Sequence, residues 1–243
     1  MDKRLLDKPI LITGCARSGT SMTAGIVDMC GAYGGLINLN KTRNNPTGMR
    51  ENIQIVNSVV KPYLKSIGAD PMCQKNLPDI AVVKSSLSDE LVDKIRHKVI
   101  NIIVSQGYDK KSLWYNKCPK MALIWPLWNA MFPDATWIIV RRDVEDIVRS
   151  CLRTSFMRAY TNKSGWILWA GEHEKRFEEM IDAKLKVYEI WPQRMINGDF
   201  KEIQNVINAI GLNWDSSMED KVRAFVEPKL WGKGQNRHGK FSN

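Results

Sequence analysis

The chain has 243 residues, a hydrophobic fraction of 44% and a formal net charge of +10 at pH 7. That hydrophobic fraction is ordinary for a globular protein, so a sizeable core can form without disulfides or structural metals. The excess of positive charge favours an anionic partner such as a nucleotide, an acidic substrate, nucleic acid or a membrane surface, although a solvated basic surface accounts for many of the lysines equally well.

Targeting and metal signals are weak. The short apolar run that ends at Gly14 is too short to span a bilayer and lacks a signal-peptide cleavage pattern, and no later stretch is long enough for a span. Five widely spaced cysteines form no CxxC pair, and three scattered histidines form no metal-binding spacing. We therefore expect a cytoplasmic protein with reduced thiols, no membrane span and no metal.

The predicted elements alternate between strands and helices. Pro9 to Thr13 is a short β-branched run that predicts a buried parallel strand, and Gly19 to Cys30 follows with helical spacing. Further helices are expected over residues 51–65, 89–105 with Ser88 as N-cap, 121–132, 143–153, 165–189, 200–210 and 218–226, strands over 113–116 and 136–140, and irregular segments over 31–50 and 66–80.

This alternation predicts an open, mostly parallel sheet with helices on both faces, which is a three-layer α/β/α architecture. No repeat, low-complexity segment or convincing linker interrupts it, so we expect one domain over residues 1–243. The polar, basic stretch over about 231–243 is expected to be a loose tail or an active-site loop.

The first chemical signal is the segment Gly14–Ser21, which joins the first strand to the first helix. Its GxxxxG frame resembles a P-loop, in which backbone N–H groups and a helix N-terminus bind phosphate or sulfate oxygens. A nucleoside-triphosphate P-loop needs lysine after the second glycine, where this chain has Thr20, and the nearest cation is Arg17. The alternative is a glycine-rich turn with no ligand.

A second signal follows the strand over 136–140. Ligands in open α/β sheets lie beyond the carboxyl ends of the strands, and Arg141 and Arg142 stand at that end. Arg142 and Ser150, about two helical turns later, can together hold one phosphate. The acids near the helix start are explained by the helix dipole alone, but the paired arginines are not. Lys117, at the end of another predicted strand, can point into the same cleft or lie on the surface.

These residues resemble the superfamily of sulfotransferases that use 3′-phosphoadenosine 5′-phosphosulfate (PAPS), most closely the bacterial type. Cys15–Ser21 is similar to the family's 5′-phosphosulfate loop, and Arg142 followed by Ser150 matches its 3′-phosphate element. The segments Lys117–Lys120, Asn45–Asn52 and Phe225–Leu230 resemble family segments more loosely.

The resemblance implies a P-loop-type fold, PAPS as donor, no metal, and a hydroxyl or amine acceptor, either a small molecule or a carbohydrate. It implies catalytic roles for Arg17, Lys117 and, as the base, Glu51. Glu51 also fits an ordinary acid at a helix start, and Asn116 stands where some relatives carry an acid. The residues implied for donor binding are Ala16, Arg17, Ser18, Gly19, Thr20, Ser21, Arg142 and Ser150.

Three other functions stay open at this stage. A P-loop nucleoside or small-molecule kinase would depend on magnesium, and Thr20 in the lysine position argues against it. A basic nucleic-acid-binding module fits the charge, but no recognition motif is present. A sulfotransferase-like domain that binds nucleotide without a base is the third. The acceptor is expected to contact segments 31–50, 66–80 and 154–165; most tryptophans are expected in the core, and His97 and His173 on solvated helix faces.

Overall fold

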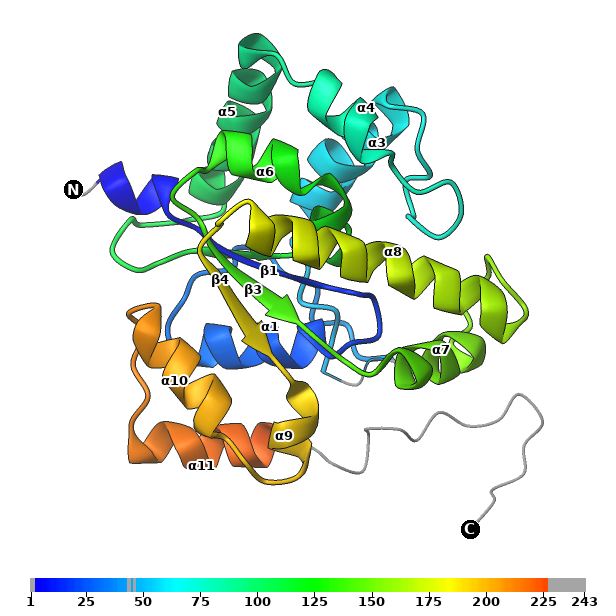
Figure 1. Ribbon diagram of the computed structural model, residues 1–243. Helices are drawn as coiled ribbons and strands as arrows, with labels where there is room; N and C mark the ends of the chain where they lie inside the picture. The colour runs from blue at the N-terminus through cyan, green and yellow to red at the C-terminus, as the bar shows by residue number, and fades with distance from the viewer. Residues whose placement is uncertain (1–2, 43–44, 46, 227–243) are drawn as a thin grey trace.

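A four-stranded parallel sheet organises the chain (Figure 1). The computed structural model describes residues 3–42, 45 and 47–226. In the described chain the strand order is β2-β1-β3-β4, and every neighbouring pair is parallel. The strands are β1 (Ile10–Gly14), β2 (Tyr115–Lys117), β3 (Thr136–Val140) and β4 (Val187–Ile190). The predicted α/β class and parallel sheet are confirmed, while the expected tail over 231–243 lies outside the described residues.

Alternate residues of each strand face opposite helical layers. Leu11, Trp137 and Ile139 pack in one core with the helices above the sheet in Figure 1. Ile10, Ile12, Ile138 and Val140 pack in a second core with the helices below it. This is the two-residue period of an extended strand with both faces covered, and it explains why the strand sequences are continuously apolar.

The helices above the sheet come mainly from the middle of the chain (Figure 1). The predicted helix over 51–65 is observed as α2, a π-helical turn η2 and α3, and the one over 121–132 as a 3₁₀ turn η3 followed by α6. Their bounds are α2 (Ile53–Ile55), η2 (Val56–Val60), α3 (Lys61–Ser66), α4 (Ile80–Ser85), α5 (Asp89–Ser105), η3 (Pro119–Ile124), α6 (Trp125–Met131) and α8 (Lys163–Asp182).

The remaining helices cover the other face and the strand ends. A short 3₁₀ turn, η1 (Lys3–Asp7), precedes β1. The others are α1 (Thr20–Met29), α7 (Val144–Arg153), α9 (Pro192–Ile196), α10 (Lys201–Ala209) and α11 (Ser216–Phe225). Within the described ranges, none of the helices has the length and apolar character that a bilayer crossing requires.

The prediction of one helix over 165–189 is wrong after Asp182. Helix α8 ends at Asp182, and the chain reverses through Lys184, whose φ of 58° is left-handed, before entering β4. In β4, Val187 packs with the core above the sheet, whereas Tyr188 packs with the core below it. That alternation is a strand signal, but it is short and lies at the sheet edge, where lysines and a glutamate mask it.

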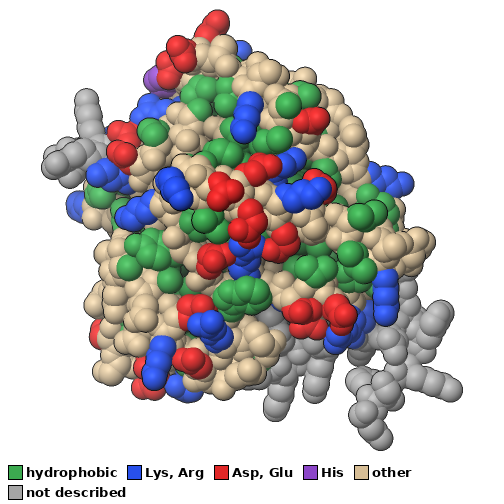
Figure 2. Space-filling model, in the orientation of Figure 1, with side chains coloured by type: hydrophobic (Ala, Val, Ile, Leu, Met, Phe, Trp, Pro, Cys, Tyr) green, Lys and Arg blue, Asp and Glu red, His purple; other side chains and the backbone are tan. Residues whose placement is uncertain are grey.

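A buried guanidinium fastens the end of β3 to α8 and β4. Arg141 is 7% exposed and bonds to the carboxylates of Glu174, Glu178 and Glu189, with an Nη2-to-Oε1 distance of 2.8 Å for Glu178. Charged side chains gather over α8 and β4 on the face shown in Figure 2. Arg141 therefore serves the architecture, while the adjacent Arg142 points elsewhere.

We expect Arg141→Met to lower the free energy of unfolding by about 2–3 kcal/mol, because three carboxylates lose their shared cation. Urea denaturation measures the change. The control is Arg194→Met, which removes one exposed guanidinium that pairs with Glu202 at 3.0 Å. We expect it to cost less than about 1 kcal/mol. Equal costs for the two variants would contradict the structural role of Arg141.

Candidate active site

The loop between β1 and α1 is shaped by two glycines. A Cβ at Gly14 would lie 2.6 Å from the carbonyl oxygen of Val140, so no side chain fits where the loop crosses the end of β3. Gly19 has a φ of 105° and is the N-cap of α1, with no side-chain hydrogen bond to the cap. The first amides of a helix have no partner within it, so this uncapped end of a ten-residue helix is electropositive and suited to an anion.

The loop is bonded directly to the segment after β3. Arg17 Nε donates to Ser150 Oγ at 3.0 Å, and Arg142 Nη1 donates to the carbonyl oxygen of Arg17 at 2.8 Å. Helix α7 begins right after Arg142 because Asp143 caps it, accepting from Glu145 N at 2.8 Å. The structure thus brings together two predicted anion-binding elements that lie more than a hundred residues apart in the chain.

Several arginine side chains lie close together at this site and repel one another. Burial lowers the pKa of Arg17, and burial together with Arg17, Arg149 and Arg153 lowers the pKa of Arg142 to about 10, although Asp146 opposes the shift. Both guanidinium groups stay charged at neutral pH. An anion bound between them would relieve the repulsion, so the folded protein favours one there.

Ser18 adds an unused hydrogen-bonding group to the loop. Its hydroxyl is buried, and its Oγ has no hydrogen-bond partner within the part of the chain that the structure describes. A buried hydroxyl without a partner costs free energy that a ligand can recover. Thr20 and Ser21 begin α1 beside it, and the side chain of Ser21 donates to the carbonyl oxygen of Met49 at 3.1 Å.

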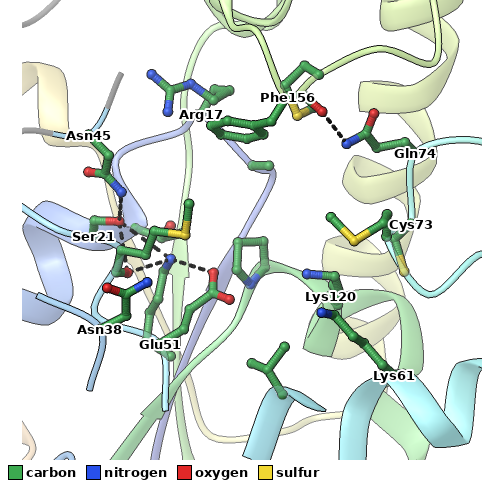
Figure 3. Close-up of a pocket in the computed structure, with 18 of the residues that line it drawn as sticks. Arg17, Ser21, Asn38, Asn45, Glu51, Lys61, Cys73, Gln74, Lys120 and Phe156 are labelled. Carbon is green, nitrogen blue, oxygen red and sulfur yellow. Dashed lines mark hydrogen bonds and ion pairs between the residues drawn. The ribbon is translucent and has the colours of Figure 1, made fainter. Parts of the chain in front are cut away.

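Lys117 and Glu51 form a buried ion pair next to this loop. Lys117 Nζ lies 3.0 Å from Glu51 Oε1, 3.0 Å from the carbonyl oxygen of Met49 and 3.4 Å from Ser21 Oγ (Figure 3). Lys117 is the last residue of β2 and pairs with Ile12 of β1, so the sheet fixes its position. The predicted Lys117 and Glu51 therefore lie together and beside the loop.

Nearby lysines keep the carboxyl group of Glu51 ionised. Burial alone would raise the pKa of its carboxyl, but Lys117, Lys120 and Lys61 outweigh burial and hold the pKa below the ordinary value of 4.5. Glu51 is consequently ionised at neutral pH. Because the folded pKa is depressed, the pair stabilises the protein above the unfolded pKa, and this contribution is lost as the pH falls through the folded pKa.

One cleft of about 390 Å³ opens from the loop past this ion pair (Figure 3). Residues of all three segments expected near an acceptor line it, as do residues of α2, η2, α3, η3 and α8. The lining residues include Arg17, Asn38, Asn45, Met49, Glu51, Lys61, Met72, Cys73, Gln74, Lys117, Lys120, Phe156, Met157, Trp169 and His173.

The prediction that His173 lies on a solvated helix face is wrong. It is a buried residue of α8 whose Nδ1 donates to the carbonyl oxygen of Trp169 at 3.0 Å, and burial lowers its pKa to about 4. The ring is therefore neutral, and Nε2 is the nitrogen without a proton. The Trp169 ring packs against it with the ring centroids 4.4 Å apart and the ring planes tilted by 56°, and Trp169 Nε1 donates to the carbonyl oxygen of Cys73 at 2.8 Å. The four-residue spacing of Trp169 and His173 was a usable signal for one buried helix face.

Lys61 was missed as a cleft residue, and Lys120 and Asn45 lay in segments that the sequence singled out but were given no role of their own. Asn45 Nδ2 donates to Ser21 Oγ at 3.2 Å, which ties the segment before Met49 to the start of α1. Lys120 stands in a segment that the sequence singled out, but only the 3₁₀ turn of η3 directs it to the cleft. Within the described residues no group of three or more His, Cys, Asp or Glu is placed to hold a metal ion.

Comparisons with known proteins agree on one family. A model of the sulfotransferase family matches residues 9–216. A putative protein-tyrosine sulfotransferase of Caenorhabditis briggsae is 23% identical over 141 residues, which make up 56% of this chain and 50% of that protein. The chain thus spans about half the length of this curated relative.

Solved structures show a similar fold. The sulfotransferase domain of the Synechococcus PCC 7002 olefin synthase superposes with a TM-score of 0.52 at 14% identity, covering 97% of this chain and 89% of that one. Sulfotransferase STF9 from Mycobacterium avium superposes with a TM-score of 0.52 at 14% identity, covering 97% of this chain and 72% of that one. Sulfotransferase STF1 from Mycobacterium tuberculosis H37Rv superposes with a TM-score of 0.50 at 15% identity, covering 89% of this chain and 70% of that one. At these identities the likeness concerns the fold, which is the P-loop-type α/β fold expected from the sequence.

We expect Lys117→Met to raise the pKa of Glu51, because burial then acts on the carboxyl with its nearest cation removed. The side-chain carboxyl ¹³C resonance, assigned with Glu51→Gln, reports the titration. Lys61→Met is the control, since Lys61 contributes least among the lysines that lower this pKa, and its effect should be smaller. An unchanged pKa in Lys117→Met would show that the ion pair does not hold the carboxylate charged.

Proposed function

The chain belongs to the sulfotransferase family, and we propose that it transfers the sulfuryl group of PAPS to a hydroxyl or amine of an acceptor. The observation that carries the donor assignment is the direct bonding of Arg17 to Ser150 and of Arg142 to the Arg17 carbonyl oxygen. These bonds set a glycine-bounded anion loop and a second cationic element side by side, as a donor with phosphates at both ends of a nucleoside requires.

The residues present fit such a donor. The uncapped amides at the start of α1, together with Arg17 and the unpartnered hydroxyl of Ser18, would hold the 5′-phosphosulfate. Arg142 and Ser150 would hold the 3′-phosphate. Ala16, Thr20 and Ser21 complete the loop, and Thr20 in place of the P-loop lysine fits a donor that carries less charge at its reacting end than a nucleoside triphosphate.

Bound PAPS supplies a sulfur atom that is joined through oxygen to a phosphate, which is the leaving group. Glu51, which is ionised and lies at the cleft, accepts the proton of the acceptor as the acceptor oxygen or nitrogen forms its bond to sulfur. The bond from sulfur to the bridging oxygen breaks, and the electron pair stays on the phosphate oxygen. Arg17 and Lys117 stabilise that developing charge from fixed positions, so catalysis rests on placement and electrostatics.

Two broader assignments belong to the same proposal. We propose that the acceptor is a small molecule or a carbohydrate, because the cleft has the size of a small-ligand site. We also propose a cytoplasmic location, because the five cysteines are all buried free thiols, which fits reducing conditions.

The donor is tested by thermal unfolding with 3′-phosphoadenosine 5′-phosphate (PAP). At a hundredfold excess over Kd, a bound ligand adds about 2.7 kcal/mol, which raises the melting temperature of a domain of this size by roughly 5–11 °C. We expect this shift in the wild type without magnesium, and its loss in Arg142→Ala.

The matched control is Arg223→Ala, which removes an exposed arginine of α11 and should keep the full shift. The melting temperature is also measured with ATP and magnesium in place of PAP. A shift with magnesium–ATP and none with PAP would reject the PAPS assignment and favour a kinase.

The base is tested with Glu51→Gln, which keeps the shape of the side chain but removes the proton acceptor. We expect kcat to fall by about 10²–10⁴-fold, the usual contribution of general base catalysis, while the PAP-induced shift is retained. Sulfated product is followed with ³⁵S-labelled PAPS. Turnover that survives in Glu51→Gln but fails in His173→Gln would move the base to His173, the other basic side chain of the cleft with a free lone pair.

A further inference from the structure

The part of the cleft beyond Glu51 is rich in positive charge. Four cations line the cleft, namely Arg17, Lys61, Lys117 and Lys120, against a single described carboxylate, that of Glu51. His173 adds no charge, because its pKa lies near 4. In the proposed function Arg17 serves the donor, and Lys117 is paired with Glu51, so two lysines have no assigned role.

Lys61 and Lys120 point into the same space from different elements. Lys61 begins α3 and Lys120 lies in η3, and Figure 3 shows both side chains on the far side of Glu51 from Ser21. Because Ser21 belongs to the donor loop, this arrangement sets the two lysines beyond the reacting group, on the acceptor side of the proposed base.

Neither ammonium is neutralised by a carboxylate. In the described part of the chain no Asp or Glu oxygen lies within 4 Å of either Nζ, and the recorded partner of Lys61 Nζ is the uncharged Asn57 Oδ1 at 2.8 Å. Burial would lower the pKa of Lys120, but Cys118, Glu51, Cys73 and Asp70 together raise it, so the group stays charged. Two partly buried ammonium groups that no described carboxylate contacts directly are stabilised further by an anion that binds between them.

Much of the remaining lining is apolar. Met72, Phe156, Met157 and Trp169 line it, and the side-chain amide of Gln74 is held by the carbonyl oxygen of Phe156 at 2.8 Å. A pocket of about 390 Å³ with apolar walls and a few convergent charges suits a compact organic molecule with one charged end.

We propose that the acceptor is a small hydroxyl compound with an anionic group, and that Lys61 and Lys120 bind that group while the hydroxyl meets Glu51. This inference rests on the proposed function and narrows its substrate class. The anionic group is a carboxylate or a phosphate, which the same two lysines recognise by charge. The lysines also offset the repulsion between such an acceptor and the anionic donor, so they favour entry of the acceptor into a cleft that already holds a nucleotide.

The test measures acceptor binding to the PAP-saturated protein, so that the donor site is already filled. Two matched series serve as probes: glucuronate, glucose 6-phosphate and glucose; and 4-hydroxyphenylacetate, 4-hydroxybenzylphosphonate and methyl 4-hydroxyphenylacetate. We expect the anionic members of at least one series to bind about tenfold or more tightly than its neutral member, as charge-assisted hydrogen bonds provide. The preference between carboxylate and phosphate then identifies the group.

The variants are Lys61→Met and Lys120→Met, with Lys65→Met as the matched control. Lys65 is an exposed residue of the same helix α3 and does not line the cleft. We expect each of the first two variants to lose the preference for the anionic probes, and Lys65→Met to keep it. The PAP-induced rise in melting temperature shows in each case that the variant is folded and its donor site intact.

Equal binding of neutral and anionic members, binding by no anionic probe, or an unchanged preference in both cleft variants would each overturn the inference. Failure of PAP to stabilise the wild type would instead reject the proposed function itself. The same probes are then offered with ³⁵S-labelled PAPS, and label is expected on the anionic compounds that bind.

Discussion

The close approach of Gly14 to the end of β3 is the constraint on which the site depends. Only a residue without a side chain lets the loop cross beside the Val140 carbonyl oxygen. This crossing puts Arg17 next to Ser150 and lets Arg142 reach the loop backbone. The parallel sheet makes the approach possible because it aligns the ends of β1 and β3, with Gly14 opposite Val140. The cationic site is therefore a product of strand register.

The two adjacent arginines that follow β3 have different roles, one in stability and the other in the proposed binding of an anion. Arg141 is surrounded by three carboxylates and fastens α8 and β4 to the sheet. Arg142 faces the loop among other arginines, and its pKa is lowered. Arg141 is bonded to three carboxylates, whereas Arg142 has one carboxylate, that of Asp146 at 3.9 Å, among the described residues and is repelled by neighbouring arginines. A bound anion would relieve that repulsion. The concentration of positive charge at the donor loop and along the cleft is the cost in stability that a binding site for anions carries.

Local patterns predicted most of the fold. The bounds of β3 and α5 and the cap at Ser88 were predicted residue by residue, because apolar runs and cap residues act within a few positions. The matched family confirms the resemblance that the Arg17 and Arg142 segments carried. The edge strand β4 and the helices α4 and α9 were missed, because each is short and is stabilised by packing rather than by its own sequence.

The sequence predicted individual residues for donor binding, but for much of the acceptor side of the cleft it predicted only segments. Arg17, Arg142 and Ser150 stand in ordered motifs, whereas Lys61, Lys120 and His173 reach the cleft through the packing of η3, α3 and α8. The burial of His173 also depends on the contact of its neighbour Trp169 with Cys73, which lies 96 positions away and which no local pattern predicts. The roles of all these residues stay predictions until the variants are measured.

The contacts that build the cleft join positions far apart in the chain. Arg17 meets Ser150 across 133 positions, Trp169 meets Cys73 across 96, and Lys117 meets Glu51 across 66. Closing such long loops costs entropy before any contact compensates for it, so these contacts are expected to form late, after the local helices. Interactions absent from the folding transition state act on the unfolding rate. A ligand in this cleft should therefore prolong the lifetime of the native state and leave the rate of folding nearly unchanged.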